Sequence, residues 1–406
     1  MPPDNEFDSL DVEIFEFDPV VEVDVEETSE GRIAIIRTTD RSTYRRCRRK
    51  WGWSSHLRGN LEKRTKPSPF WTGSGFHFAL EDFHGEKKYE NIVDAFYAYT
   101  EATKRYDKKN LPGDWQEQRE LAVGMLQYYQ DEWLPQRDPF KTFIHNGIPQ
   151  TEVNFRIDLP WEPGKFGYDK VVYSGTIDRV IIDANGLLWL VEYKTAKIIQ
   201  TLHLENDFQV SAYVWAGTHL YPGYQVAGVV YQQHRKVVPH DPAWTHSGFS
   251  CDKKQLTTPK RYRDSLIKTY GSVENSPGKN IDFLNSLTTA EDGDWSKYVR
   301  RDWSERNEHQ CRAEGVKILL ELDEMLNPDL PLYPNPTRDC HYLCDFVGPC
   351  VSIDDGGDWE YELDALMKTK DRSYDSWRKY LPSQTELQVL LEQQAQVNQP
   401  LTDLFQ

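Results

Sequence analysis

The sequence of 406 residues has no apolar run long enough to cross a membrane, and it does not begin with a secretory signal. We therefore expect an intracellular, cytoplasmic protein that makes no membrane contacts. The sequence also has no Gly-x-x-x-x-Gly-Lys-Ser/Thr phosphate loop, because Gly278-Lys279 is followed by Asn280 and lacks the required upstream glycine. This absence excludes an ATP-driven helicase.

Basic residues are missing from one end of the chain. Residues 1–30 contain many Asp and Glu but no Lys or Arg, whereas residues 41–64 are strongly basic. The net charge of −17 therefore comes largely from the first segment, and it does not exclude a polyanionic ligand for the rest. We expect residues 1–31 to be a flexible acidic leader. The alternatives are a pseudosubstrate that covers a basic groove and a segment that recruits a partner protein.

Cysteine is scarce, and its distribution is uneven. Only six cysteines occur in the chain, and three of them, Cys340, Cys344 and Cys350, lie close together. In an intracellular protein such clustering indicates a metal or an iron–sulfur cluster rather than disulfides. Three ligands are one short of the usual four. The candidates for the fourth ligand are Cys47, Cys251 and Cys311.

Residues 171–194 predict a β-hairpin with charged residues in apolar strands. Both strands are rich in Val, Ile, Leu and aromatic residues, and Asn185-Gly186 between them is a strong turn signal. If the loop is 184–186, then Asp178 lies opposite Glu192, and Lys194 shares the face of Glu192. Two carboxylates so close together repel each other unless a divalent cation lies between them, and oxygen ligands suit Mg²⁺ or Mn²⁺. A buried network of ion pairs is the simpler alternative.

The other segments predict a mixed sheet flanked by helices. We expect strands at 32–37, 150–157 and 225–234, in addition to the hairpin. We expect helices at 42–51, from Gly73 or Gly75 to about 85, at 89–108, 113–135, 207–220, 257–270 and 301–327. Residues 236–300 are polar and form an expected insertion, and residues 351–406 form an expected polar, partly helical and peripheral tail.

Two of the expected helices carry polar pairs at one-turn spacing. His77 and Glu81 share a face of one helix, and Gln209 and Tyr213 share a face of the other. A single His on a helix is more often structural than a metal ligand, so these pairs alone do not define a site.

Taken together, these segments resemble the PD-(D/E)XK nuclease superfamily, and most closely its RecB-like branch of AddB-type and CRISPR-adaptation-type iron–sulfur exonucleases. Four segments carry the resemblance in chain order: Gly73-Ser-Gly-Phe-His77-Phe-Ala-Leu-Glu81, Gly175-Thr-Ile-Asp178, Glu192-Tyr-Lys194 and Gln209-Val-Ser-Ala-Tyr213. Iron–sulfur members of the branch place one Cys before the His motif and three near the C-terminus. The resemblance thus selects Cys47 with Cys340, Cys344 and Cys350, although the Cys340–Cys344 gap is one residue longer than the commonest spacing.

The resemblance implies a set of roles for these residues. Asp178 and Glu192 would bind Mg²⁺ or Mn²⁺, together with the Tyr193 backbone carbonyl and His77, whose helix partner is Glu81. Lys194 would orient the attacking water or stabilise the transition state. Gln209 and Tyr213 would position DNA, with Tyr213 able to stack on a base. The four cysteines would hold a [4Fe-4S] cluster, with Zn²⁺ as the alternative.

We therefore expect an α/β protein with a restriction-endonuclease-like core over residues 32–350 and a Cys clasp that joins its helical N- and C-terminal regions. The expected function is metal-dependent exonuclease action on DNA ends, on single strands, in recombination, repair or replication. The expected partners are DNA and a helicase or recombination protein, and a role in CRISPR adaptation is an open subtype. The rival hypothesis is a catalytically silent DNA-binding or regulatory subunit on the same fold.

Overall fold

The computed structural model describes residues 26–28, 31–64, 68–108, 111–290, 297–370 and 376–397. Most of the acidic leader lies outside these residues, so our expectations for it stay predictions. Within the described part of the chain, no helix combines the length and the apolar character that a membrane span requires.

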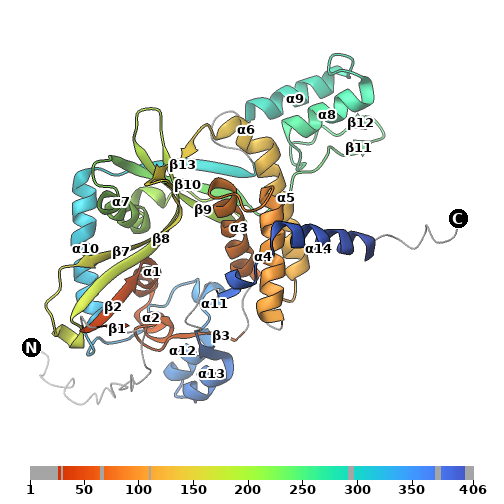
Figure 1. The fold of residues 1–406 in the computed structure, drawn as a ribbon. Helices are drawn as coiled ribbons and strands as arrows, with labels where there is room; N and C mark the ends of the chain where they lie inside the picture. The colour runs from red at the N-terminus through yellow and green to blue at the C-terminus, as the bar shows by residue number, and fades with distance from the viewer. Residues whose placement is uncertain are drawn as a thin grey trace, which may run out of the picture.

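One mixed sheet organises the molecule (Figure 1). Its strands are β1 (Glu26–Thr28), β2 (Gly31–Arg37), β4 (Lys141–Thr142), β7 (Thr151–Leu159), β8 (Lys170–Ile182), β9 (Leu188–Ala196), β10 (Val226–Arg235) and β13 (Val299–Glu305). The order is β1-β2-β8-β9-β10-β13, and β4 and β7 also pair with β8. The pairs β2–β8 and β9–β10 are parallel, and the others are antiparallel.

Shorter strand pairs and helices surround this sheet. The two-stranded pairs are β3 (Leu61–Lys63) with β14 (Met367–Thr369), β5 (Ile144–His145) with β6 (Ile148–Pro149), and β11 (Trp244–Thr245) with β12 (Gly248–Phe249). The helices are α1 (Thr38–Arg46), α2 (Arg48–Ser54), α3 (Ser68–His84), α4 (Ile92–Asp107), α5 (Trp115–Tyr128), α6 (Leu134–Arg137), α7 (Phe208–Leu220), α8 (Pro259–Tyr270), α9 (Gly278–Ala290), α10 (Glu308–Leu326), α11 (Cys340–Leu343), α12 (Val347–Asp354), α13 (Trp359–Leu366) and α14 (Gln384–Val397). A π-helical turn, η2 (Tyr129–Trp133), joins α5 to α6, and short 3₁₀ turns occur at η3 (Lys165–Gly167), η4 (Leu204–Asn206) and η5 (Ser376–Tyr380).

The sheet is buried on both faces, as its nearly continuous apolar strands require. Along β9, Leu188 and Leu190 point into a core shared with α7 and α10, whereas Trp189 and Val191 point into a core shared with α3, α4 and α5. Figure 1 shows these two groups of helices on opposite sides of the sheet. This arrangement confirms the predicted mixed sheet flanked by helices.

The predicted register of the hairpin is confirmed. Arg179 pairs with Val191, and the Asp183 N–H donates to the Leu187 carbonyl at 3.0 Å, so the loop is 184–186. Two strands pair in turn with one edge of β8. Strand β2 pairs with the part of β8 that ends at Ser174, and β9 pairs with the part that begins at Arg179. Residues 175–178 therefore lie where two neighbouring strands diverge, and this divergence leaves room for side chains to gather around Asp178.

Gly175 is required at this divergence by its surroundings. A Cβ at this position would lie 2.6 Å from Thr38 Oγ1 and 2.7 Å from Phe155 Cζ, closer than real Cβ contacts come. The glycine therefore lets α1 and β7 approach the strand that carries Asp178.

Three expected helix boundaries are wrong. The helix expected at 42–51 begins at Thr38, and it is interrupted at Cys47, whose extended backbone separates α1 from α2. Asp40, in the first turn of α1, accepts the Arg37 N–H. Helix α3 begins at Ser68 and runs through Gly73 and Gly75, because tertiary packing outweighs the low helix propensity of glycine.

The expected helix at 301–327 is wrong at its start. Residues 299–305 form β13, which pairs with β10, and α10 begins only at Glu308. The expected insertion thus ends before β13, and it has a small core of its own that includes Tyr262 and Phe283. The segment expected to be peripheral is also packed against the body, since Trp377 and Leu387 are buried in the core of α3 and α4.

A buried carboxylate ties this sheet to the end of the helical layer. The Asp138 carboxylate lies 3.0 Å from Arg179 Nη1 and 3.2 Å from Arg301 Nη2, and all three side chains are almost fully buried. Burial opposes its ionisation, but the two guanidinium groups lower the pKa of Asp138. Breaking such a site leaves uncompensated charge in the interior.

We therefore expect Asp138→Asn to lower the free energy of unfolding by about 3–5 kcal/mol, as measured by urea denaturation. The control is Asp264→Asn, which removes an exposed carboxylate 3.0 Å from Lys260 and should cost less than about 1 kcal/mol. Equal effects of the two substitutions would contradict the structural role of Asp138.

Candidate metal and catalytic site

Asp178 is fixed by its neighbours on both sides. Its Oδ2 accepts the Tyr193 backbone N–H at 2.7 Å, and its Oδ1 lies 3.3 Å from His77 Nδ1. Burial opposes ionisation, but the charge of His77 and these contacts lower the pKa of Asp178 below its usual value. The carboxylate is therefore ionised and held in one orientation.

Glu192 is buried beside Asp178 with only one of its two oxygens satisfied. Its Oε1 accepts from Gln209 Nε2 at 3.0 Å and from the ammonium of Lys194. Its Oε2 is buried and has no hydrogen-bond partner among the described residues. Burial, only partly offset by Lys194, raises the pKa of Glu192 to about 7, and the negative charge of Asp178 adds to this rise.

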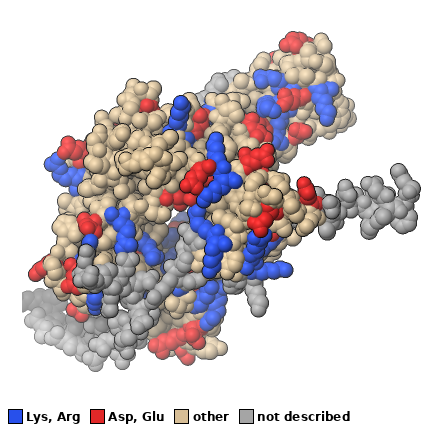
Figure 2. Space-filling model, in the orientation of Figure 1, with Lys and Arg blue, Asp and Glu red and all other residues tan. Residues whose placement is uncertain are grey.

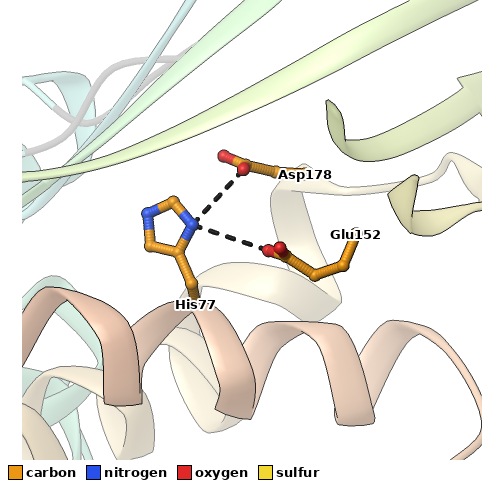
Figure 3. A group of neighbouring side chains, drawn as sticks. All are labelled: His77, Glu152 and Asp178. Atoms are coloured by element: carbon orange, nitrogen blue, oxygen red, sulfur yellow. Dashed lines mark ion pairs between the residues drawn. The ribbon is translucent and has the colours of Figure 1, made fainter. Parts of the chain in front are cut away.

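Helix α3 carries His77, whose ring points at the carboxylates of Asp178 and Glu152 (Figure 3). His77 Nδ1 lies 3.7 Å from Glu152 Oε1 as well as close to Asp178. Burial disfavours the charged ring, but Asp178 and Glu152 raise the pKa of His77 well above its usual value. Without a metal, the imidazolium of His77 and the ammonium of Lys194 thus balance the negative charge of the site.

Glu152 is the site residue that sequence reasoning missed. One ligand atom each from His77, Glu152 and Asp178 lie within 4.8 Å of one another. Glu152 lies on β7, and the flanking pairs Thr151–Arg179 and Val153–Ile177 place it opposite Asp178. Its backbone has a positive φ of 45°, which is rare for a residue with a side chain. The signal was present, since a carboxylate within an expected strand is the same anomaly that singled out Asp178.

Gln209 and Tyr213, the polar pair on α7, lie between Glu192 and the apolar core. Gln209 Nε2 donates to Tyr213 Oη at 3.0 Å as well as to Glu192. Tyr213 is only 7% exposed and packs in the apolar core, so its ring face is not open to a nucleobase. This burial gives no support to the predicted stacking of Tyr213 on a base. The geometry instead makes Gln209 and Tyr213 positioning residues for Glu192.

Glu81 does not act as the expected partner of His77. Both of its carboxylate oxygens accept from Arg378, at 3.1 and 2.7 Å. This bidentate pair joins α3 to the C-terminal segment η5. His77 takes its partners from β7 and β8 instead.

The four predicted cluster cysteines approach one another from both ends of the chain. Burial raises the pKa of the Cys344 thiol, and the neighbouring Cys340 and Cys47 add to this rise. Cys350 is joined to α2 through Arg49, whose Nη1 lies 3.3 Å from its sulfur. Backbone N–H groups also point at two sulfurs, from Lys50 to Cys47 at 3.4 Å and from Thr337 to Cys340 at 3.3 Å. The other candidates lie elsewhere, Cys311 in the core beside α7 and Cys251 near Tyr262.

The residues around Asp178 fit a divalent cation. The donors are carboxylate oxygens with one imidazole nitrogen, a set that suits Mg²⁺ or Mn²⁺. The unpaired Glu192 Oε2 is the kind of buried oxygen that a cation would satisfy. The arrangement can therefore hold a metal ion beside the ammonium group of Lys194. These are the groups that metal-assisted hydrolysis of an anionic ester requires.

Comparison with known proteins gives one informative match. A family model described as the PD-(D/E)XK nuclease superfamily matches residues 38–351. No curated protein matches the sequence. Among ten matching chains of solved structures, one titled "Crystal structure of SSO0001" has 13% identity and a TM-score of 0.18, covering 36% of this chain and 73% of that one. At that TM-score the likeness supports no conclusion about this chain.

Proposed function

The chain belongs to the PD-(D/E)XK nuclease superfamily, and from this we propose that it is a metal-dependent exonuclease of the RecB-like branch. Its reaction is hydrolysis of phosphodiester bonds at DNA ends, on single strands, in recombination, repair or replication. The observation that carries the proposal is the pair of buried carboxylates, Asp178 and Glu192, with the ammonium of Lys194 on one of them. A regulatory subunit without catalysis would have no need for this arrangement.

Asp178, Glu192, His77 and the Tyr193 carbonyl would hold Mg²⁺ or Mn²⁺, and Glu152 is a further ligand candidate. When bound, the metal lowers the pKa of a water and neutralises charge on the phosphate. The residues of the chain do the rest. Lys194 holds the attacking water or the developing negative charge, and Gln209 keeps Glu192 in place through its hydrogen bond. The Tyr193 N–H fixes Asp178 in the same way.

Glu152 gives a test of how many side chains hold the metal. We expect Glu152→Gln to raise the Mg²⁺ concentration for half-maximal cleavage about tenfold, since loss of a metal-site partner typically costs 10–100-fold in affinity or activity. The maximal rate at saturating metal should change much less. Cleavage assayed over a series of Mg²⁺ concentrations measures both values, with Glu162→Gln, an exposed carboxylate elsewhere, as the control. An unchanged Mg²⁺ requirement would remove Glu152 from the site.

The exonuclease assignment is tested by removing DNA ends. Wild-type protein with Mg²⁺ or Mn²⁺ should shorten linear single-stranded DNA and leave a covalently closed single-stranded circle of the same sequence intact. Loss of the circle at the same rate would show an endonuclease. A 5′ or 3′ label on the linear strand gives the polarity from the product ladder.

DNA as the substrate is supported by the distribution of charge. Figure 2 shows Lys and Arg side chains in a band down the middle of one face, with acidic groups beside its upper end. Local basic surface of this kind attracts a polyanion even when the net charge is negative. Because the sequence has no phosphate loop, a helicase or recombination protein is the partner that would supply unwound strands.

We also propose that Cys47, Cys340, Cys344 and Cys350 hold a [4Fe-4S] cluster as a clasp between α2 and the C-terminal segment. Zn²⁺ is the alternative occupant of the four sulfurs. The N–H and Arg49 contacts to sulfur suit thiolates in either case.

The division into parts follows the same proposal. Residues 32–350 form the nuclease domain, residues 236–300 approximate an insertion, and residues 351–406 form a C-terminal extension. The small core around Tyr262 and Phe283 supports the insertion.

A further inference from the structure

The loop between β9 and α7 exposes apolar side chains to solvent. Leu202 is 99% exposed and Ile198 is 72% exposed. Scattered surface apolar residues are ordinary, so exposure alone means little. Two features distinguish this loop from other exposed apolar surface. Hydrogen bonds anchor it on both sides of Leu202, and it lies beside the proposed catalytic residues.

Two anchors, one on either side of Leu202, tie the loop to the sheet and to Arg306. Gln233, itself buried, accepts the Gln200 N–H at 3.0 Å and donates to the Gln200 carbonyl at 2.8 Å. Further along, Arg306 Nη2 donates to the Leu204 carbonyl at 2.8 Å, and the Leu204 side chain is buried. Leu202 lies in the short stretch between these anchors, with its side chain in water.

The anchors place the loop beside the proposed catalytic residues. In the parallel pair of β9 with β10, Gln233 is the partner of Lys194 and Tyr231 is the partner of Glu192. Registered partners of neighbouring strands point to the same face, so Gln233 and Tyr231 share the face of the site. The His203 ring packs on Tyr231 with centroids 5.7 Å apart. The loop therefore starts directly after the catalytic strand and lies against its neighbour.

Positive charge lies at the base of the same loop. The Lys236 N–H donates to the Ala196 carbonyl at 2.8 Å, next to Lys197 in the chain. Burial lowers the pKa of Lys236, and the charge of Lys197 lowers it further. Two like charges held together are unfavourable alone and are stabilised by an anion such as a phosphate backbone. Basic groups at the base and apolar groups at the tip match the two parts of a nucleotide.

We infer that residues 197–203 form a substrate-strand contact, in which Leu202 and Ile198 pack against unstacked nucleobases next to the phosphodiester bond that is cleaved. This inference rests on the proposed nuclease function and deepens it, because it assigns base contacts that Tyr213 cannot make. An unstacked base has an apolar face that gains by contact with such side chains, as base-step wedges in other proteins do. The contact does not read sequence, since every base offers such a face.

The test is the double substitution Ile198→Ser with Leu202→Ser, compared with Leu320→Ser, which removes an equally apolar side chain that is 63% exposed on α10. Cleavage kinetics on linear single-stranded DNA give KM and kcat, and fluorescence anisotropy with Ca²⁺ in place of Mg²⁺ gives the Kd. We expect the loop variant to raise KM and Kd about tenfold, equivalent to about 1.4 kcal/mol, with kcat within about twofold of the wild type. Leu320→Ser should change none of these values.

A 2-aminopurine base next to the cleaved bond reports the contact directly. Its fluorescence should change on binding to the wild type and to Leu320→Ser, and much less on binding to the loop variant. Unchanged KM, Kd and fluorescence response in a wild type that cleaves DNA would overturn this inference alone. A wild type that binds DNA through the loop but never cleaves it would instead overturn the proposed function.

Discussion

Glu192→Gln is expected to reduce the rate of DNA cleavage by about a thousandfold, because metal-bound charge stabilisation is worth several kcal/mol and each 1.36 kcal/mol is about tenfold in rate. The substitution keeps the shape of the side chain, and it keeps one oxygen that can accept hydrogen bonds from Gln209 and Lys194. What it removes is the negative charge at the buried Oε2, which has no other partner in the described structure.

The folded state of this variant should be intact. Burial of the Glu192 carboxylate is already unfavourable, as the rise of its pKa to about 7 shows, so the amide costs little. A thermal melt with and without Mg²⁺ separates folding from binding. At a metal concentration of about 100 times the Kd, the wild type should gain about 2.7 kcal/mol of stability, and Glu192→Gln should gain much less. An equal gain in both proteins would place the metal elsewhere.

Cys344→Ser is expected to release iron and to lower the free energy of unfolding by about 3–5 kcal/mol. The proposed clasp joins Cys47 to residues 340–350. Closing a loop of roughly 300 residues removes conformational entropy from the unfolded chain, about 5–6 kcal/mol in the disulfide case, and measured effects often fall below this value. The loss should appear first as disorder of α12 and α13, which pack against α2 through a small core around Trp53 and Phe346.

Iron and zinc analysis of the purified protein, visible absorbance and urea denaturation measure these effects together. Cys251→Ser is the matched control, since Cys251 is exposed and its sulfur contacts Tyr262 in the insertion instead of the clasp residues. If the wild type contains zinc and no iron, the four cysteines hold a structural zinc ion and not an iron–sulfur cluster. Retention of full metal content and stability by Cys344→Ser would contradict the clasp.

The sequence was sufficient to predict the parts of the site that depend on local geometry. The loop at 184–186 fixes the register of the hairpin, and this register alone brings Asp178 to Glu192. The family resemblance added His77 and Gln209, which lie on separate helices and have no local link to the hairpin. His77 lies beside Asp178, next to the expected metal ligands. Gln209, which the resemblance assigned to DNA, donates to Glu192.

What the sequence did not predict depends on tertiary packing. Glu152 reaches the site only because β7 pairs with β8 in one register and its backbone adopts a positive φ. Glu81 has the right helical spacing for His77, but Arg378 from far along the chain binds it instead. The break at Cys47 was also invisible, since the apolar spacing of Tyr44, Cys47 and Trp51 suits one continuous helix.

The same limit applies to the expectation that Tyr213 could stack on a base. A one-turn spacing from Gln209 places both residues on one face of α7, but it does not say whether that face looks toward solvent or core. In the structure the face looks toward Phe155 and Tyr173, and only Gln209 reaches the carboxylates. Base contacts therefore have to come from another element, for which the loop after β9 is the candidate.

The measurement that tests the central claim most directly is cleavage of end-labelled single-stranded DNA by the wild type and by Asp178→Asn, with Mg²⁺, with Mn²⁺ and with a chelator. The account predicts loss of label with either metal in the wild type, none with the chelator, and none above background with Asp178→Asn under any condition. Cleavage that persists in the chelator or in Asp178→Asn, or a folded wild type that cleaves no strand with either metal, would contradict it.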